Sequence, residues 1–241
     1  MADPRITIVF DNNPGVPGLK SLWGFAALLQ VPGQTILFDT GSNGRVLLRN
    51  MAMLGLSPES VDLIFLSHPH WDHMGGLDSV LELVPTARVA VHAGFSKHLI
   101  HDLRGQCAEL LVVGSDPMEL ASGIWSTGLI DSDPPEHALV VDTQGVTAAV
   151  TGCAHPGIGR IVEHARRVTG KRIHWAIGGF HLMYAGPAEI REAIETVQKL
   201  GVGRVVPTHC TGDQARAAFR QAYGPGYTDG GVGVEIAITP P

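Results

Sequence analysis

The sequence predicts an α/β fold in which two β-sheets are covered by helices. Short aliphatic and β-branched runs fill most of the first two thirds of the chain, whereas strand and helix patterns alternate over the last third. Hydrophobic residues make up 44% of the 241 residues and charged residues 17%, so the chain can bury a sizeable core. We therefore expect a single domain that covers residues 1–241.

Three strands followed by a helix are expected at the start of the chain. The strand patterns cover residues 5–10, 24–31 and 34–38, and a Pro-Gly turn separates the last two. This arrangement is typical of an antiparallel meander. Apolar positions then recur at helical spacing over residues 45–54 and stop before Gly55, which predicts the first helix.

A strand that is buried on both faces is expected over residues 61–66, because these residues form an unbroken apolar run that leads into His68. A helix over residues 74–84 and a strand over residues 88–92 should follow. Residues 107–151 have the pattern of several short strands separated by Gly, Pro and Asp. In the last third, the predicted helices cover residues 158–168, 188–200 and 214–222, and the predicted strands cover residues 173–177, 204–206 and 232–238.

Charge and apolar pattern argue against several classes of partner. The formal net charge is -6 and there is no basic stripe, so nucleic acid is not expected as a substrate. No apolar run approaches the roughly 20 residues that cross a bilayer, and the start MADPRITIVF does not resemble a secretory signal. We therefore expect a cytoplasmic protein that does not bind membranes. The three scattered cysteines should be reduced, because they are too few for a disulfide scaffold.

The segment SHPHWDHMGG, residues 67–76, has the spacing of a metal site. Side chains two residues apart in an extended segment point to the same side, so His68 and His70 can bind one ion. The chain must then turn into the next helix, which would direct Asp72 and His73 toward a second ion. A solvated histidine-rich loop is the alternative, but an HxHxDH pattern at a strand-to-helix junction is much more specific than a lone HxH pair.

Four neighbouring residues leave a metal site incomplete, so further ligands are expected from elsewhere in the chain. His155 and His209 each follow a predicted strand and precede a glycine that marks the start of a helix, which predicts that both lie at the same sheet edge. A capping or core histidine is the alternative for each. His181 has a similar strand-end setting, and its role is ambiguous. Cys153 and Cys210 are close to these histidines in the sequence and could add a thiolate ligand, although small buried cysteines are the plainer interpretation.

The segment FDTG (38–41), the HxHxDH run, His155 and His209 resemble motifs of the metallo-β-lactamase superfamily and occur in that family's order, and five longer segments are similar to one branch of it. They are LFDTG (37–41), SHPHWDHMGGL (67–77), TGCAHPGI (151–158), IGGFHL (177–182) and PTHCTG (207–212). The resemblance covers nearly the whole chain, and within the superfamily the segments are similar to the branch named for dihydropterin ribofuranosyl-aminobenzene phosphate synthase. It implies an αββα four-layer sandwich with one or two metal ions at its open edge.

The resemblance also implies how the ligands are distributed. One ion would be held by three imidazoles, those of His68, His70 and His155. The other would be held by one carboxylate and two imidazoles, those of Asp72, His73 and His209. Asp39 would lie at the edge of the site and hold a ligating imidazole in place. Two-metal enzymes of the superfamily usually carry a bridging aspartate where this chain has His181, so the number of ions stays open.

These residues predict a metal-dependent hydrolase that acts on a small ester, lactone, amide or phosphate-containing substrate. A Zn²⁺ ion lowers the pKa of bound water to about 7 and polarises a carbonyl or phosphoryl oxygen, and Fe²⁺ or Mn²⁺ would suit the same ligands. Asp72 is expected to orient or deprotonate the water, and His181 to donate a proton or bind the developing anion. Four further side chains are candidates for the substrate pocket: Trp23, Trp71, Tyr184 and Arg160.

Three other functions are compatible with the same residues. The first is an iron-dependent redox enzyme of the same fold, and the second is a synthase or lyase in pterin-type metabolism. The third is a protein that keeps its metal and binds a small ligand without turning it over. Metal content and turnover would separate these alternatives.

Overall fold

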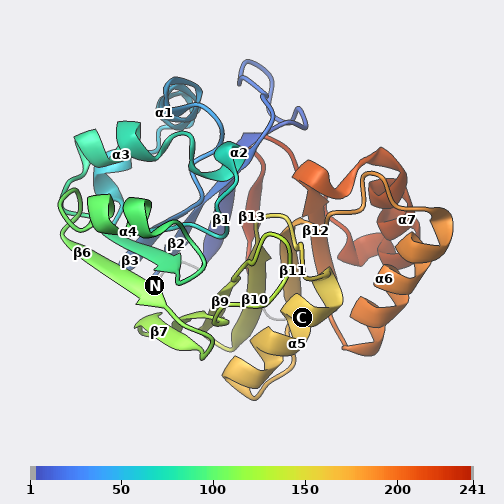
Figure 1. The fold of residues 1–241 in the computed structure, drawn as a ribbon. Coiled ribbons are helices and arrows are strands. Elements are labelled where there is room, and N and C mark those ends of the chain that lie inside the picture. The colour runs from blue at the N-terminus through green and yellow to red at the C-terminus, as the bar shows by residue number, and fades with distance from the viewer. Residues whose placement is uncertain (1–3, 240–241) are drawn as a thin grey trace.

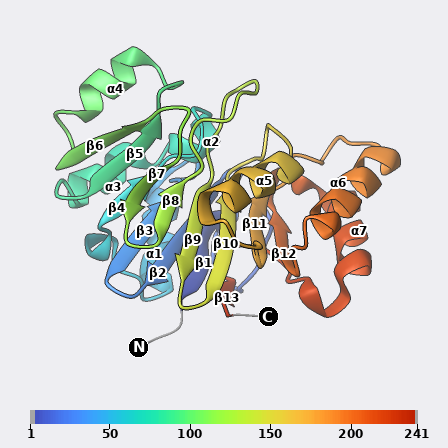
Figure 2. The same cartoon turned by 90° about the horizontal axis from the view of Figure 1, so that it is seen from below.

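Two β-sheets pack face to face and carry helices on both outer faces in the computed structural model, which describes residues 4–239 (Figure 1). The helices of the first outer layer are α1 (Gly44–Met53), α3 (Leu77–Leu83) and α4 (Lys97–Leu103). Those of the second outer layer are α5 (Ile158–Thr169), α6 (Pro187–Lys199) and α7 (Asp213–Tyr223). The view from below shows the same order of layers (Figure 2). This order of helices, sheet, sheet and helices confirms the αββα sandwich.

Within the described residues, the first sheet has seven strands in the order β13-β1-β2-β3-β4-β5-β6. Their bounds are β1 (Arg5–Asp11), β2 (Phe25–Val31), β3 (Gln34–Phe38), β4 (Leu63–Phe65), β5 (Arg88–His92), β6 (Glu109–Val113) and β13 (Glu235–Ala237). Strands β1, β2 and β3 pair antiparallel, which confirms the predicted meander, and β3 to β6 pair in parallel. The carboxyl ends of β3 and β4 lie side by side, since Phe38 pairs with Phe65.

The second sheet has six strands among residues 4–239, in the order β12-β11-β10-β9-β8-β7. Their bounds are β7 (Met118–Ala121), β8 (Ile124–Ser126), β9 (Leu139–Thr143), β10 (Val146–Thr151), β11 (Trp175–Gly179) and β12 (Arg204–Thr208). Strands β10, β11 and β12 are parallel, and Thr151, Gly178 and Pro207 are aligned across them. The loops at the carboxyl ends of these three strands therefore meet at one edge of the sheet.

Three apolar clusters hold the four layers together. The cluster between the sheets includes Phe65 and Ile177, and each outer cluster joins one sheet to its helices. Strand β4 shows how one segment serves two clusters: Leu63 and Phe65 face the other sheet, whereas Ile64 faces the helices. Burial on both faces explains the unbroken apolar run in the sequence.

The helix expected over residues 74–84 is found as α3, but its predicted start was wrong, because Met74 belongs to a separate short helix. Helix α2 (Trp71–Met74) ends before Gly75, and α3 begins after Gly76. A Cβ on Gly76 would lie 2.4 Å from the carbonyl oxygen of Thr40, and one on Gly75 would lie 2.7 Å from that of Ser42. The two glycines therefore let the chain pass against the loop after β3, where a continuous helix of larger residues would clash.

Helix α4 was not predicted, because its apolar side chains, those of Leu99, Ile100 and Leu103, span little more than one turn. Three short 3-10 helices complete the elements of residues 4–239: η1 (Pro58–Ser60), η2 (His209–Thr211) and η3 (Gly224–Gly226). None of the helices in this range has the length and apolar character that a bilayer span requires.

Candidate metal centre

Three histidines converge beyond the carboxyl ends of β4 and β10. His68 and His70 follow β4, and the backbone of His70 is extended. His155 follows β10, and its ring lies 4.9 Å from the rings of both His68 and His70. One potential ligand atom of each residue lies within 4.8 Å of the other two. We call these three residues the first ligand group.

A carboxylate and two histidines form the second ligand group, which consists of Asp72 and His73 in α2 and His209 after β12. His73 Nε2 and His209 Nε2 are 3.2 Å apart. Asp72 Oδ2 lies 3.7 Å from His73 Nε2 and 3.4 Å from His209 Nε2. All three residues are buried. The rings of His68 and His73 are 4.1 Å apart, so the two ligand groups adjoin. The structure thus brings together all six residues that the sequence predicted as ligands.

The buried carboxylate of Asp39 is linked to one histidine of each group. Its Oδ2 accepts a hydrogen bond from His73 Nδ1 at 2.7 Å and another from Ser67 Oγ at 2.7 Å. Because Ser67 Oγ uses its hydrogen for Asp39, it must accept from His68 Nδ1, which is 2.9 Å away. Asp39 therefore keeps the Nδ1 proton on His73 directly and on His68 through Ser67.

Asn12 keeps the Nδ1 proton on His209 in the same way. Its Nδ2 donates to the carbonyl oxygen of His209 at 3.3 Å, which leaves its Oδ1 to accept from His209 Nδ1 at 2.7 Å. In the neutral forms of these histidines, Nε2 then carries a lone pair and no hydrogen. Asn12 was not singled out in the sequence, because its contact with His209 spans 197 residues of the chain.

This donor set fits a bound cation. The Nε2 lone pairs of His73 and His209 face each other, and the buried Nε2 of His155 has no hydrogen-bond partner among the described residues. Buried polar atoms normally have a partner, and lone pairs in close contact repel unless a cation lies between them. Imidazole and carboxylate ligands of this kind suit Zn²⁺, Fe²⁺ or Mn²⁺.

The pKa shifts of His68, His155 and Asp72 also favour metal binding. Burial lowers the pKa of His68 well below its ordinary value and that of His155 to about 3, so both imidazoles are neutral near pH 7. Burial raises the pKa of Asp72, but its hydrogen bond with His209 and the charge of His73 outweigh this effect and bring it to about 2. Asp72 is therefore ionised. Burial lowers the pKa of His73, but the charge and the hydrogen bond of Asp39 outweigh this effect and raise it, so a cation would have to compete with a proton there.

A second buried carboxylate, that of Glu136, holds the loop that carries His155. Its Oε1 accepts hydrogen bonds from Thr151 Oγ1 and from the backbone N–H groups of residues 152 to 154, at 2.7 to 3.1 Å. Its Oε2 accepts the backbone N–H of His155 at 2.9 Å. Glu136 was missed in the sequence, because a lone glutamate between predicted strands gives no signal of such a contact.

Backbone strain is concentrated at this site. Five non-glycine residues among those described have a positive φ, and four of them lie in the cluster or next to it: Asp39, Ala154, His181 and His209. Each such conformation costs an L-residue about 1–2 kcal/mol. The packing that aims these side chains therefore outweighs several unfavourable local conformations.

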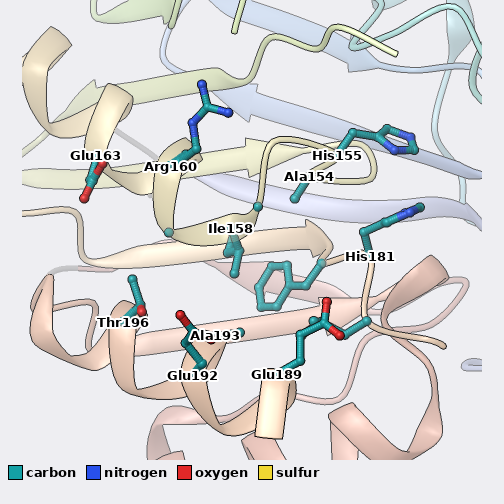
Figure 3. A pocket seen from close by; sticks show the side chains of 14 residues that line it. Ala154, His155, Ile158, Arg160, Glu163, His181, Glu189, Glu192, Ala193 and Thr196 are labelled. Carbon is teal, nitrogen blue, oxygen red and sulfur yellow. The ribbon is translucent and has the colours of Figure 1, made fainter. Parts of the chain in front are cut away.

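His181 lies beside the first ligand group and is exposed to solvent. Its ring centroid is 4.3 Å from that of His155. A hydrogen bond with the Cys210 sulfur, and the negative charge that this sulfur carries as a thiolate, raise the pKa of His181. Figure 3 shows the imidazoles of His155 and His181 next to each other at one end of a cavity of about 340 Å³ that lies between α5 and α6.

The predicted pocket residues have different surroundings. Trp23 and Tyr184 line a second cavity of about 270 Å³, which also borders on His181. Arg160 lines the first cavity, but it is exposed and donates a hydrogen bond to the carbonyl oxygen of Asp131. Trp71 is 64% exposed and lines neither cavity. The structure therefore places three of the four candidates beside a cavity.

Comparison with known proteins identifies the family of the chain. The sequence profile of the metallo-beta-lactamase superfamily matches residues 24–209. The chain is 28% identical to a protein of Methanocaldococcus jannaschii that is named 7,8-dihydropterin-6-methyl-4-(beta-D-ribofuranosyl)-aminobenzene-5'-phosphate synthase, over 83% of this chain and 84% of that protein. A shorter similarity, 49% identity over 49 residues, relates 20% of the chain to 15% of the ribonuclease Z of Nanoarchaeum equitans.

A solved structure agrees over nearly the full length. It is described as a metal-dependent hydrolase of the beta-lactamase superfamily, and it has a TM-score of 0.80 and 25% identity to this chain. The match covers 98% of this chain and 100% of that one. The resemblance seen in the sequence motifs is confirmed, and the chain belongs to the metallo-beta-lactamase superfamily.

Proposed function

We propose that the protein is a metal-dependent hydrolase that acts on a small ester, lactone, amide or phosphate-containing molecule. The observation that carries this proposal is the pair of adjoining ligand groups, in which imidazole nitrogens and one carboxylate point at common positions. A cation such as Zn²⁺ at such a site would activate water and polarise a carbonyl or phosphoryl oxygen. A small-molecule substrate, rather than nucleic acid, is in keeping with the net charge of -6, and a cytoplasmic location completes the proposal.

Asp72 is the group that would hold the attacking water. It is ionised, and its Oδ2 faces the Nε2 atoms of His73 and His209. The carboxylate can accept a hydrogen bond from the water and orient the lone pair of the water oxygen toward the substrate. Replacement by Asn would keep the shape of the side chain and remove most of its capacity to accept a proton.

His181 would act on the other side of the reacting bond. Its raised pKa increases the protonated fraction near neutral pH, and its exposed ring borders both cavities. An imidazolium there can donate a proton to the leaving group or a hydrogen bond to the developing anion.

The charge of the first cavity favours a substrate with little negative charge. The side chains that line it include three carboxylates, those of Glu163, Glu189 and Glu192, against one guanidinium, that of Arg160. Trp23 and Tyr184 in the second cavity provide an apolar surface for an aromatic or aliphatic portion. We therefore favour neutral esters, lactones and amides over substrates with several phosphate groups.

The test is a reconstitution assay. Protein stripped of metal with a chelator is loaded with Zn²⁺, Fe²⁺ or Mn²⁺ and assayed on a panel of chromogenic esters, lactones, amides and phosphodiesters. We expect hydrolysis that depends on the added metal, that falls about 100-fold or more in Asp72→Asn, and that falls in His181→Ala while metal content stays unchanged. Exposed His98, outside the site, provides the control His98→Ala. A protein that binds no added metal, or hydrolysis that survives the chelator, would refute the proposal.

A synthase reaction is the second candidate, because the relative from Methanocaldococcus jannaschii has that name and matches most of the chain. The same metal-loaded protein can be incubated with pterin and aminobenzene precursors, and product formation followed by mass spectrometry. Product formation without hydrolysis anywhere in the panel would favour the synthase over the hydrolase.

A further inference from the structure

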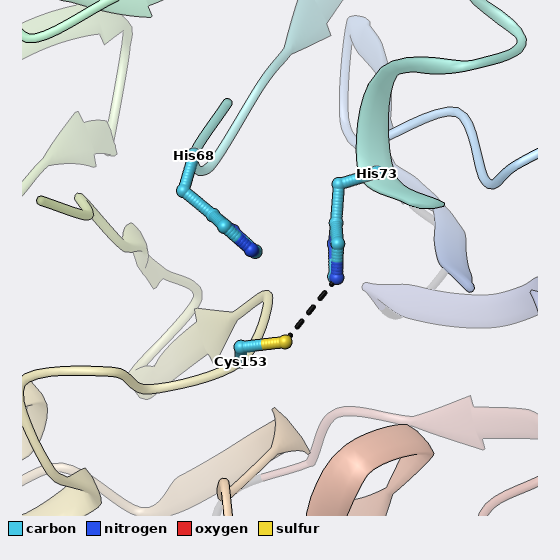
Figure 4. Close-up of side chains that lie close together, drawn as sticks. All are labelled: His68, His73 and Cys153. Carbon is cyan, nitrogen blue, oxygen red and sulfur yellow. Dashed lines mark hydrogen bonds between the residues drawn. The ribbon is translucent and has the colours of Figure 1, made fainter. Parts of the chain in front are cut away.

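Cys153 lies at the centre of the cluster, between the two ligand groups. It follows β10 and is 4% exposed, and Glu136 Oε1 accepts its backbone N–H at 3.1 Å. Its Sγ lies 3.3 Å from His73 Nε2, and Figure 4 shows this sulfur facing the rings of His68 and His73.

The sulfur is within reach of both ligand groups. Cys153 Sγ lies within 4.8 Å of ligand atoms of His68 and His155 in the first group, and of His73 and His209 in the second. Among the described residues that could hold a metal, it is the one that shares such groupings with two members of each group. A cation bound by either group would therefore have this sulfur as a neighbour.

The surrounding backbone is shaped to admit the sulfur. A Cβ on Gly152 would lie 2.2 Å from Ser67 Oγ and 3.0 Å from His68 Nδ1. A Cβ on Gly179, at the end of β11, would lie 2.7 Å from Cys210 Sγ. Gly152 therefore lets the backbone pass close to His68, and Gly179 lets β11 pass close to the Cys153 backbone, so that the loop after β10 presents Cys153 between the two groups.

The charge of the two ligand groups also favours a thiolate between them. The two ligand groups contain five imidazoles and one carboxylate, so with neutral imidazoles they supply a single negative charge. Two divalent cations bring four positive charges and repel each other at short range. A thiolate between them adds a second negative charge at the position where it reduces this repulsion most.

We propose that Cys153, as a thiolate, is a ligand shared by the two cation positions of the cluster, an inference that rests on the metal centre of the proposed function. When metal binds, the S–H bond breaks, its proton passes to solvent, and the sulfur lone pairs bind the metal. Cys210 is assigned no such role, because His209 is the one ligand-group residue with which it shares a possible metal grouping, so its sulfur does not reach both groups.

Cobalt titration of the metal-free protein tests the proposal. Co²⁺ bound to a thiolate gives an intense near-ultraviolet charge-transfer band, whereas Co²⁺ bound to nitrogen and oxygen gives visible bands alone. We expect wild-type protein to bind two equivalents with the charge-transfer band. We expect Cys153→Ser to lose that band and to bind the second equivalent at least about tenfold more weakly. The matched controls Cys107→Ser and Cys210→Ser should keep both properties, and circular dichroism checks that each variant is folded.

Zinc X-ray absorption gives an independent measurement that does not depend on the folding of Cys153→Ser. We expect a sulfur neighbour at about 2.3 Å in zinc-loaded wild type, Cys107→Ser and Cys210→Ser. Because the chain has three cysteines, a sulfur that persists in both controls is assigned to Cys153. A shell of nitrogen and oxygen alone in wild type, or a sulfur signal that Cys210→Ser abolishes, would overturn the proposal. Absence of any metal binding would refute the proposed function itself, so the two failures are distinguishable.

Discussion

The substitution Asp39→Asn tests whether a single buried carboxylate orients ligands of both groups. Asp39 Oδ1 accepts the backbone N–H of Ser67 at 2.7 Å, and Oδ2 accepts from Ser67 Oγ and His73 Nδ1. Asparagine has one oxygen, so one of these two positions becomes an N–H donor. Asp39 has a φ of 53°, a conformation that asparagine also tolerates well, so the backbone should not change.

The expected loss depends on these contacts. If the amide nitrogen faces His73, the imidazole must accept at Nδ1, which moves its proton to Nε2 and removes the lone pair that faces the second ligand group. Loss of such a supporting contact typically weakens metal binding 10- to 100-fold, or about 1.4–2.7 kcal/mol. We expect the larger loss at the second group, because His68 reaches Asp39 only through Ser67.

Isothermal titration of metal-free protein with Zn²⁺ measures this effect. Asp62→Asn is the matched control, because Asp62 also accepts a backbone N–H, that of Thr35 at 2.8 Å, but lies on the surface away from the cluster. The control should bind Zn²⁺ like wild type. Folded Asp39→Asn protein with unchanged affinity for both equivalents would show that the Asp39 contacts do not determine the state of the ligands.

Three further substitutions test the support of the site and the pH dependence of stability. In Glu136→Gln one buried backbone N–H faces an amide nitrogen instead of an oxygen, so the free energy of unfolding should fall by about 1–3 kcal/mol. Urea denaturation measures this loss, and the exposed Glu119→Gln is the control. In Gly76→Ala the new Cβ would lie 2.4 Å from a carbonyl oxygen. The free energy of unfolding should therefore fall by about 1–3 kcal/mol, and Zn²⁺ binding should weaken. Stability and Zn²⁺ binding equal to those of wild type would contradict the close approach. Burial lowers the pKa of His92 to about 4, so between pH 6.5 and about 4 the unfolded chain binds a proton that the folded chain does not, and stability falls as the pH falls. His92→Phe should remove this contribution, so that the variant gains about 3 kcal/mol relative to wild type on going from pH 7 to pH 4, whereas a difference that does not vary with pH would refute the assignment.

The sequence carried more information about the ligands than about the groups that support them. His68, His70, Asp72 and His73 occupy one short segment, so the local spacing alone predicts that they lie together. His155 and His209 could be predicted because the loops at the carboxyl ends of parallel strands meet at one sheet edge, and Thr151 is indeed aligned with the end of β11 and β12.

Asn12 and Glu136 could not be predicted in this way. Each acts through a contact made only in the folded chain, Asn12 with His209 across 197 residues and Glu136 with backbone N–H groups that carry no sequence signal. The break at Gly75 and Gly76 was missed for a similar reason, since only the folded chain shows the loop against which they pack.

The distinction between ligands and supporting groups determines which measurement identifies each role. A ligand such as His155 binds the cation directly, so its loss should remove metal. A supporting group such as Glu136 holds the loop that carries a ligand and does not reach the cation itself, so its loss should weaken metal binding and stability together. His181 lies beside the ligands but outside both ligand groups, so its loss should lower turnover while metal content and stability stay unchanged. Activity alone would fall in all three cases, and metal affinity is therefore the quantity that separates the residues that hold the cation from the residue that acts on the substrate.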